Sequence, residues 1–363
     1  MFKLSKFQII CLMLWVVMGT GILTVPFTIA QFTIRDGWIS CLLFFFGILL
    51  CSGTCFFFIK MFPNRNLTEA IIDAFGPIFG TCVGVWLAAW FFVTTSAIVR
   101  EFVDFTHANL LPKSPPSLLG AVMLMIVGIA VYLGIEVVGR LSEIITLLAI
   151  ITAIIIIPLT IKNIDFRLLQ PTLIDGFSPV FRGAFMPVFG FAVEILVVLQ
   201  IAPYVTKAPT LWRNVLFLGG IVTLLLTMNQ IIIVGTLGNS TNYLVYPVLE
   251  VVRSIKIGHF IERLDTLYVL GIITTLFLKM AFFHYCFISI IKCTAKATAA
   301  RFFIWPATLL ILVGSIYLFK TSSDLADYMI YVAPCYFMFT LVFIPLGASL
   351  CQLIKVRIFS VQR

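Results

Sequence analysis

The stretch that decides the fold is MGTGILTVP at residues 18–26, in the middle of an apolar run over residues 7–31. Each glycine in a helix costs about 1 kcal/mol relative to alanine, and Pro26 removes a backbone donor. Two hypotheses follow. The chain unwinds at Gly19–Ile22 and offers free backbone groups to a small ligand, or the small residues allow close helix packing.

The composition places this run in a membrane protein. Of 363 residues, 61% are apolar and 11% are charged, whereas a soluble domain carries about 25% charged residues. Because a helix needs roughly 20 apolar residues to cross a bilayer, we expect one all-α polytopic membrane domain over residues 1–363, without a soluble domain. Ten spans are predicted at residues 7–31, 37–60, 77–103, 117–135, 141–162, 183–205, 212–237, 264–293, 302–319 and 328–353.

The net charge of +9 follows from this topology. With the N-terminus inside, the cytoplasmic loops hold thirteen basic and four acidic residues, so they carry the whole excess. Basic residues gather on cytoplasmic loops of membrane proteins. The pattern therefore predicts cytoplasmic N- and C-termini and contact with the lipid bilayer, and it requires no nucleic acid.

A second possible interruption lies in span 183–205. Pro187 and Gly190 bracket it, and Glu194 follows one turn later. Interrupted spans at matching positions of two halves indicate a midplane substrate site in an inverted-repeat transporter. This match favours unwinding of both spans. The predicted ligand-binding residues are Gly19, Thr20, Gly21, Ile22, Phe189, Gly190, Phe191 and Ala192.

Two charged side chains lie inside predicted spans, Glu194 in the sixth and Lys279 in the eighth. A charge at bilayer depth costs about 2.5–3.5 kcal/mol and faces a partner, water or the bundle interior. Lys279 could pair with Glu194, stand as a fixed cation where other transporters bind sodium, or exchange a proton. We favour the fixed interior cation, and the sequence leaves the pairing open.

Two connecting segments are predicted to contain short amphipathic helices. In segment 61–76, Asn66 followed by Glu69 forms a capping-box pattern, which predicts a helix along the cytoplasmic interface. In segment 240–263, Leu249, Val252 and Ile255 share a face, which predicts an external helix packed over the bundle.

The sequence contains no motif for a metal, a cofactor or catalysis. There is no P-loop, GxGxxG, GxSxG or HExxH pattern, and the histidines stand apart. The nine cysteines include no CxxC pair and lie in or beside apolar runs, so we interpret them as buried thiols. An enzyme is therefore not expected, and neither a cofactor nor a metal is predicted.

Several segments together resemble the spore germination permease family. Its members are the integral-membrane B subunits of germinant receptors, in the amino acid–polyamine–organocation superfamily. The order and spacing of the segments carry the resemblance, which runs nearly end to end. They are Met18-Gly19-Thr20-Gly21-Ile22-Leu23 with Pro26, Arg35-Asp36-Gly37-Trp38-Ile39-Ser40, Phe62-Pro63, Gly134-Ile135-Glu136-Val137-Val138-Gly139-Arg140, Tyr246-Pro247 to Arg253, and Ile261-Glu262-Arg263-Leu264-Asp265 leading to Phe277-Leu278-Lys279.

The resemblance implies a LeuT-like fold of two five-helix inverted repeats, at about 7–162 and 183–319, with helix 10 at about 328–353 and helices 1 and 6 unwound at the midplane. Gly19 to Ile22 and Gly190 to Glu194 match the two unwound segments, and Lys279 matches the lysine of helix 8. Ala192 and Val193 stand where relatives often have a glycine and an aromatic residue.

The implied function is germinant sensing in the cell membrane or spore inner membrane. The small-molecule germinant is expected to be an amino acid, with its carboxylate at amides near Gly21 and its ammonium at carbonyls of the helix-six break. A and C subunits of the germinant receptor are the implied partners. The alternatives are a proton-coupled amino acid transporter, with Glu194 or Lys279 as the coupling group, and a germinant-gated passage for water or ions.

Overall fold

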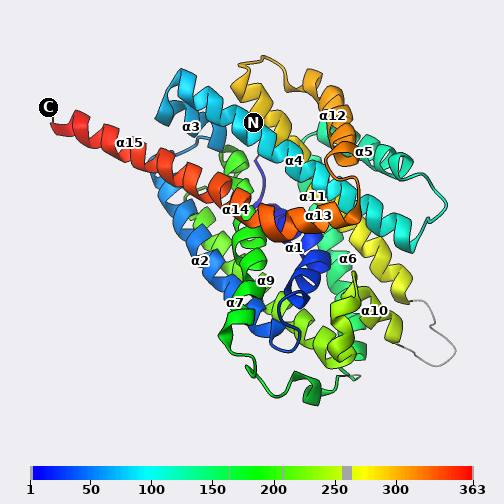
Figure 1. Ribbon diagram of the computed structural model, residues 1–363. Helices are drawn as coiled ribbons and strands as arrows, with labels where there is room; N and C mark the ends of the chain where they lie inside the picture. Colours follow the sequence, from blue (N-terminus) through cyan, green and yellow to red (C-terminus); the bar gives the residue numbers. More distant parts are fainter. Residues whose placement is uncertain (1–2, 163, 207, 256–263, 362–363) are drawn as a thin grey trace.

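The computed structural model describes residues 3–162, 164–206, 208–255 and 264–361 (Figure 1). Within these ranges, ten helices or helical series are long and apolar enough to cross a membrane, which confirms the predicted spans. Seven are single helices between short connections or 3₁₀ turns: α1 Lys6–Ala30, α2 Gly37–Met61, α4 Pro77–Asn109, α5 Pro116–Leu133, α6 Ile135–Ile161, α9 Leu211–Leu237 and α11 Leu264–Thr294. An eighth, α12 Ile304–Tyr317, follows a 3₁₀ turn at Ala300–Phe303.

Two spans are composite. The sixth consists of α7 Phe177–Met186, a π-helical turn Pro187–Phe191, α8 Ala192–Glu194 and a 3₁₀ segment Ile195–Tyr204. The tenth consists of α13 Ser322–Asp327, a π turn Tyr328–Val332, α14 Ala333–Met338, a second π turn Phe339–Phe343 and α15 Ile344–Val361. Two short helices, α3 Leu67–Phe75 and α10 Pro247–Ser254, lie in connections, and 3₁₀ turns occur at Phe166–Leu169, Ala208–Thr210 and Gly238–Tyr243.

The first and sixth spans form the centre of the bundle. In the most apolar 18-residue stretch of each of these two spans, 78% and 89% of the residues are buried, whereas in α6 only 11% are. Figure 1 shows α1 surrounded by the other helices, with α15 extending away from them toward the C-terminus. The peripheral helices expose large apolar side chains, as contact with lipid requires. The residues predicted for the site therefore belong to the two most enclosed spans.

The predicted unwinding of the first span is wrong. The α1 helix is continuous from Lys6 to Ala30 and includes Gly19–Ile22. The penalty of about 1 kcal/mol for each glycine is smaller than the several kcal/mol needed to leave each backbone group unbonded in an apolar interior. Gly19 serves close packing instead, because a Cβ atom there would lie 3.1 Å from Lys279 Cβ and 3.2 Å from the Thr275 carbonyl oxygen.

The sixth span is also helical throughout, so its predicted unwinding is wrong as well. It does leave α geometry at the predicted residues, changing from α to π at Pro187 and to 3₁₀ after Glu194. The Ala192 N–H donates to the Pro187 carbonyl, five residues earlier. Pro187 has no backbone N–H to donate to the carbonyl one α-helical turn earlier. The wider π turn allows the N–H groups that follow it to remain hydrogen-bonded. Such turns are frequent at functional sites.

The capping box predicted for segment 61–76 is confirmed. The Glu69 N–H donates to Asn66 Oδ1 at 2.8 Å, and the Asn66 N–H donates to Glu69 Oε2 at 3.2 Å. The helix α3 that begins there buries its apolar stripe and contacts α4 and α15. Its buried residues are Leu67, Thr68, Ala70, Ile71 and Ala74.

Replacing Asn66 with alanine is expected to lower the free energy of unfolding by about 1 kcal/mol, because the cap to Glu69 is lost. Asn66→Asp is the matched control, since aspartate caps a helix as well as asparagine does. Thermal melting of the detergent-purified proteins measures both. Equal melting temperatures for the alanine variant and the native chain would contradict a stabilising cap.

A helix is present in segment 240–263 as predicted: α10 packs over the bundle and contacts α9 and α11. Leu249, Val252 and Ile255 are all buried, as the pattern predicted. Residues 256–263, which include the matching Ile261-Glu262-Arg263, lie outside the described residues. The interpretation of all cysteines as buried thiols is wrong for Cys82 and Cys335, which are exposed on helices of the apolar outer surface.

Candidate functional site

The two charges inside the spans form one buried ion pair. Lys279 Nζ, from α11, lies 2.6 Å from Glu194 Oε2 at the end of α8. The same ammonium donates to Thr20 Oγ1 of α1 at 2.6 Å. Lys279, Glu194 and Thr20 are only 1%, 2% and 1% exposed. Three central spans thus meet at a single ammonium group, and Lys279 is paired with Glu194 in this conformation.

Two aromatic rings lie close to the ammonium. Nζ of Lys279 lies 5.4 Å from the ring centre of Phe191 and 5.5 Å from that of Phe283. A cation over an aromatic face gains about 2 kcal/mol or more when it is desolvated. The rings also exclude water, which strengthens every charge interaction inside the site. We call Thr20, Phe191, Glu194 and Lys279 the charge centre.

Only some of the predicted ligand-binding residues reach the charge centre. Thr20 and Phe191 belong to it, Gly19 packs against Lys279, and a Cβ at Gly21 would be 3.8 Å from the Phe191 ring. The remaining predicted residues face elsewhere. Phe189 packs on Phe185, a Cβ at Gly190 would collide with Met186, Ile22 is half-buried, and the Ala192 carbonyl accepts from Cys51 Sγ.

Sequence reasoning missed a second buried carboxylate, Glu101 of α4. Glu101 is 6% exposed, and its Oε1 accepts a hydrogen bond from Thr24 Oγ1 at 2.6 Å. Thr24 lies one turn beyond Thr20 on α1. The predicted third span ends at residue 103, so Glu101 falls beside its end, whereas α4 continues to Asn109. The length of α4 and the bond from Thr24 appear only in the structure, so the sequence offered no signal of this burial.

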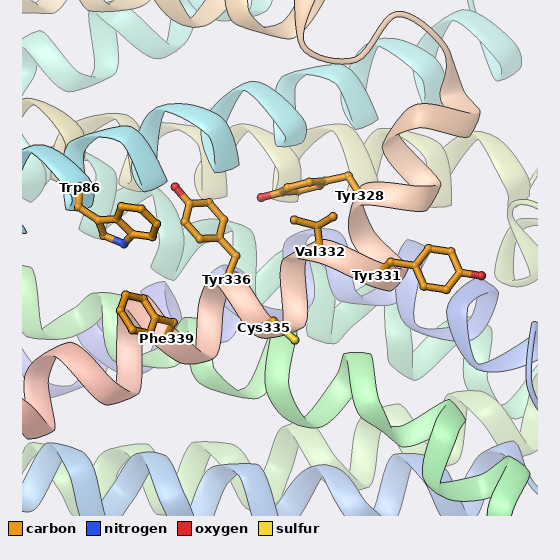
Figure 2. Close-up of a pocket in the computed structure, with 7 residues that line it drawn as sticks. All are labelled: Trp86, Tyr328, Tyr331, Val332, Cys335, Tyr336 and Phe339. Atoms are coloured by element: carbon orange, nitrogen blue, oxygen red, sulfur yellow. The ribbon is translucent and has the colours of Figure 1, made fainter.

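Two hollows lie beside the tenth span. The larger, of about 580 Å³, is an open aromatic groove between α4 and the tenth span. Figure 2 shows Trp86 of α4 facing Tyr336 and Phe339, with Tyr328 beside them. The smaller, of about 420 Å³, lies between the end of α1, α7 and the tenth span, and it reaches Met186 at the edge of the π turn. None of the predicted site residues lines either hollow.

Solved transporter structures share this architecture. The transporter MHP1, of the nucleobase-cation-symport-1 family, matches with a TM-score of 0.64 over 98% of this chain and 93% of its own, at 11% identity. MhsT in complex with L-phenylalanine matches with a TM-score of 0.66 over 98% and 99% of the two chains, at 13% identity. These similarities confirm the LeuT-like fold of the bundle. The boundaries of the two repeats remain a prediction.

Sequence relatives identify the family. Spore germination protein KB of Bacillus subtilis (strain 168) is 24% identical over 92% of this chain and 90% of its own length. Spore germination protein A2 of the same organism is 25% identical over 73% of each chain. The profile of the spore germination protein family matches residues 3–324. With ten membrane-spanning segments in its described part and this match over nearly its whole length, the chain belongs to the spore germination protein family of multi-pass membrane permeases.

Proposed function

We propose that the chain is the germinant-sensing membrane subunit of a spore germinant receptor and binds a small nutrient, most readily an amino acid, at the charge centre. The observation that carries this proposal is the ion pair between Lys279 and Glu194. It lies where α1, α8 and α11 meet, in the most enclosed spans of a transporter-like bundle.

The charges of this pair match those of an α-amino acid. Separating Lys279 from Glu194 would leave two buried charges unpaired, and removing one partner of such a pair costs about 3–5 kcal/mol. A zwitterion avoids this cost, because its carboxylate can pair with the Lys279 ammonium while its ammonium pairs with the Glu194 carboxylate. Backbone amides near Gly21 are no longer suitable ligand groups, since the continuous α1 helix already uses them.

The smaller hollow is the side from which we propose that the nutrient enters. Met186, which lines it, directly precedes the π turn that leads to Glu194. A π turn has an extra residue relative to the α pattern, so a change in its hydrogen bonding would move Phe191 and Glu194 together. Nutrient entry from this side would then open the charge centre.

Nutrient binding would shift the equilibrium between conformations by the difference in its affinity for them. We place this chain in the spore inner membrane with both termini cytoplasmic. The A and C subunits would respond to its change of conformation. A receptor needs only this shift, whereas a transporter must also release the nutrient on the other side.

Thr20→Val is expected to weaken amino acid binding by roughly tenfold or more. It removes a hydrogen bond to a charged group, which is worth about 1.5–3 kcal/mol, and each 1.4 kcal/mol is tenfold in affinity. Thr28→Val is the matched control on the same helix, because the Thr28 hydroxyl donates only to the Val25 carbonyl. Titration calorimetry, after a thermal-shift screen of amino acids, sugars and nucleosides, measures the change.

Uptake into proteoliposomes separates the sensor from a transporter. A sensor is expected to bind the amino acid without accumulating it under an imposed pH gradient. Accumulation of labelled amino acid would establish proton-coupled transport instead. Germinant-dependent shrinkage of the same vesicles in a stopped-flow experiment would establish a water or ion passage.

A further inference from the structure

The buried polar groups around α1 contain more negative than positive charge. Glu194 and Glu101 are both buried, and the Lys279 ammonium bonds to Glu194 and Thr20. Glu101 Oε1 accepts from Thr24, but its Oε2 is buried with no hydrogen-bond partner among the described residues. An ionised carboxylate with one bare oxygen in an apolar interior is costly, because it is neither paired nor fully hydrogen-bonded.

Among the residues that the structure describes, no neighbouring cation neutralises Glu101. On its own helix, Arg100 Nε pairs with Asp104 at 2.9 Å, and its Nη1 donates to the Phe319 carbonyl at 2.7 Å. The other groups that interact electrostatically with Glu101 are Asp104, Glu194 and Lys279, together with the phenol of Tyr246, which precedes α10. Apart from Lys279, which Glu194 already holds, these groups are acidic or neutral.

We propose that Glu101 is a proton-binding site, separate from the nutrient site. One proton from water adds to a Glu101 carboxylate oxygen, and the resulting O–H donates to Thr24 Oγ1. The other oxygen then belongs to a neutral carbonyl, which is far less costly to bury without a partner than an ionised oxygen. The proton supplies the one positive charge that the two carboxylates and Lys279 lack.

A proton fits this place better than a metal cation. Sodium requires several oxygen ligands, whereas Glu101 has one hydroxyl contact, from Thr24, and its second oxygen has no partner in the described part of the chain. No group of three or more His, Cys, Asp or Glu side chains that could hold a metal ion occurs among the described residues. A carboxyl O–H needs only a single acceptor.

The position of Glu101 links the proton to the charge centre. Thr20 and Thr24 are one helical turn apart on α1, about 5.4 Å along the axis, and they bond Lys279 and Glu101 respectively. Loss of the proton would leave a second carboxylate competing with Glu194 for the Lys279 ammonium. Deprotonation therefore favours separation of Lys279 from Glu194, so protonation of Glu101 stabilises the closed ion pair.

Infrared difference spectroscopy of the detergent-purified protein, recorded without any nutrient, tests the assignment. The native chain at neutral pH is expected to show a protonated-carboxyl stretching band that Glu101→Gln removes. Glu250→Gln, on the surface helix α10, is the matched control and should leave the band unchanged. Thr24→Val should keep the band but shift it to higher frequency, because the carboxyl loses its hydrogen-bond partner. If Glu101→Gln does not fold, this shift tests the assignment in its place.

Three results would overturn the proposal. The band could be absent from the native chain, or persist in Glu101→Gln and vanish in Glu194→Gln, which would place the proton on Glu194. It could also appear only when N-methylglucamine replaces sodium, which would make sodium the bound cation. Because no nutrient is present, these outcomes are independent of whether an amino acid binds at the charge centre.

Discussion

Lys279→Met is expected to lower the free energy of unfolding by about 3–5 kcal/mol, the cost of leaving a buried charge without its partner. The substitution keeps the volume of the side chain but removes the ammonium that bonds Glu194 and Thr20. It should also abolish germinant response at every pH, since a fixed cation is missing whatever the proton concentration. A shifted pH optimum would instead indicate a lysine that exchanges protons.

A double-variant cycle isolates the ion pair. Adding Glu194→Gln to Lys279→Met removes the unpaired carboxylate, so it should restore most of the lost stability. Lys292→Met is the matched control, because Lys292 lies on the same helix with an exposed side chain. Thermal or denaturant unfolding in detergent measures the native chain, the single variants Lys279→Met and Glu194→Gln, the double variant and the Lys292→Met control. If the double variant lost as much stability as the two single variants combined, the pair would make no coupled contribution.

Gly19→Ala and Gly21→Ala are expected to act in opposite directions. A Cβ at Gly19 would lie 3.2 Å from the Thr275 carbonyl oxygen and 3.1 Å from Lys279 Cβ, so α1 and α11 must move apart. Overpacking of this kind costs about 1–3 kcal/mol and would displace the ammonium from Glu194. A Cβ at Gly21 finds ordinary contact at 3.8 Å, so alanine there should gain up to about 1 kcal/mol from its helix propensity.

The same pair of substitutions distinguishes a packed helix from an unwound one. Melting temperatures and amino acid affinity should fall for Gly19→Ala and stay level or rise for Gly21→Ala. Similar losses for both variants would show that the whole segment needs the conformational freedom of glycine, as an unwound first span would.

The sequence predicted the parts of the fold that depend on length and composition. The ten spans follow from apolar runs long enough to cross a bilayer. The Asn66 cap and the buried face of α10 follow from local spacing. Glu194 and Lys279 were recognisable because a charge inside a span is costly and needs a role.

The wrong predictions concern residues at which a low intrinsic helix propensity competes with tertiary packing. Gly19 and Gly21 weaken a helix, but nothing in the sequence shows that α11 approaches Gly19 closely enough to need it. The bond between Glu194 and Lys279 joins residues 85 positions apart, so it depends on how two helices face each other. Glu101 resembled the charged end of a span until α4 was seen to continue past it.

A bound zwitterion is expected to replace the internal pairing of Lys279 with Glu194. The most direct measurement is the thermal stabilisation of the native chain and the Lys279→Met/Glu194→Gln variant by the best-binding amino acid, its decarboxylated amine and its deaminated acid. We predict stabilisation by the amino acid alone, and only in the native chain. Equal stabilisation of the double variant, or of the native chain by the amine or the acid, would contradict the account.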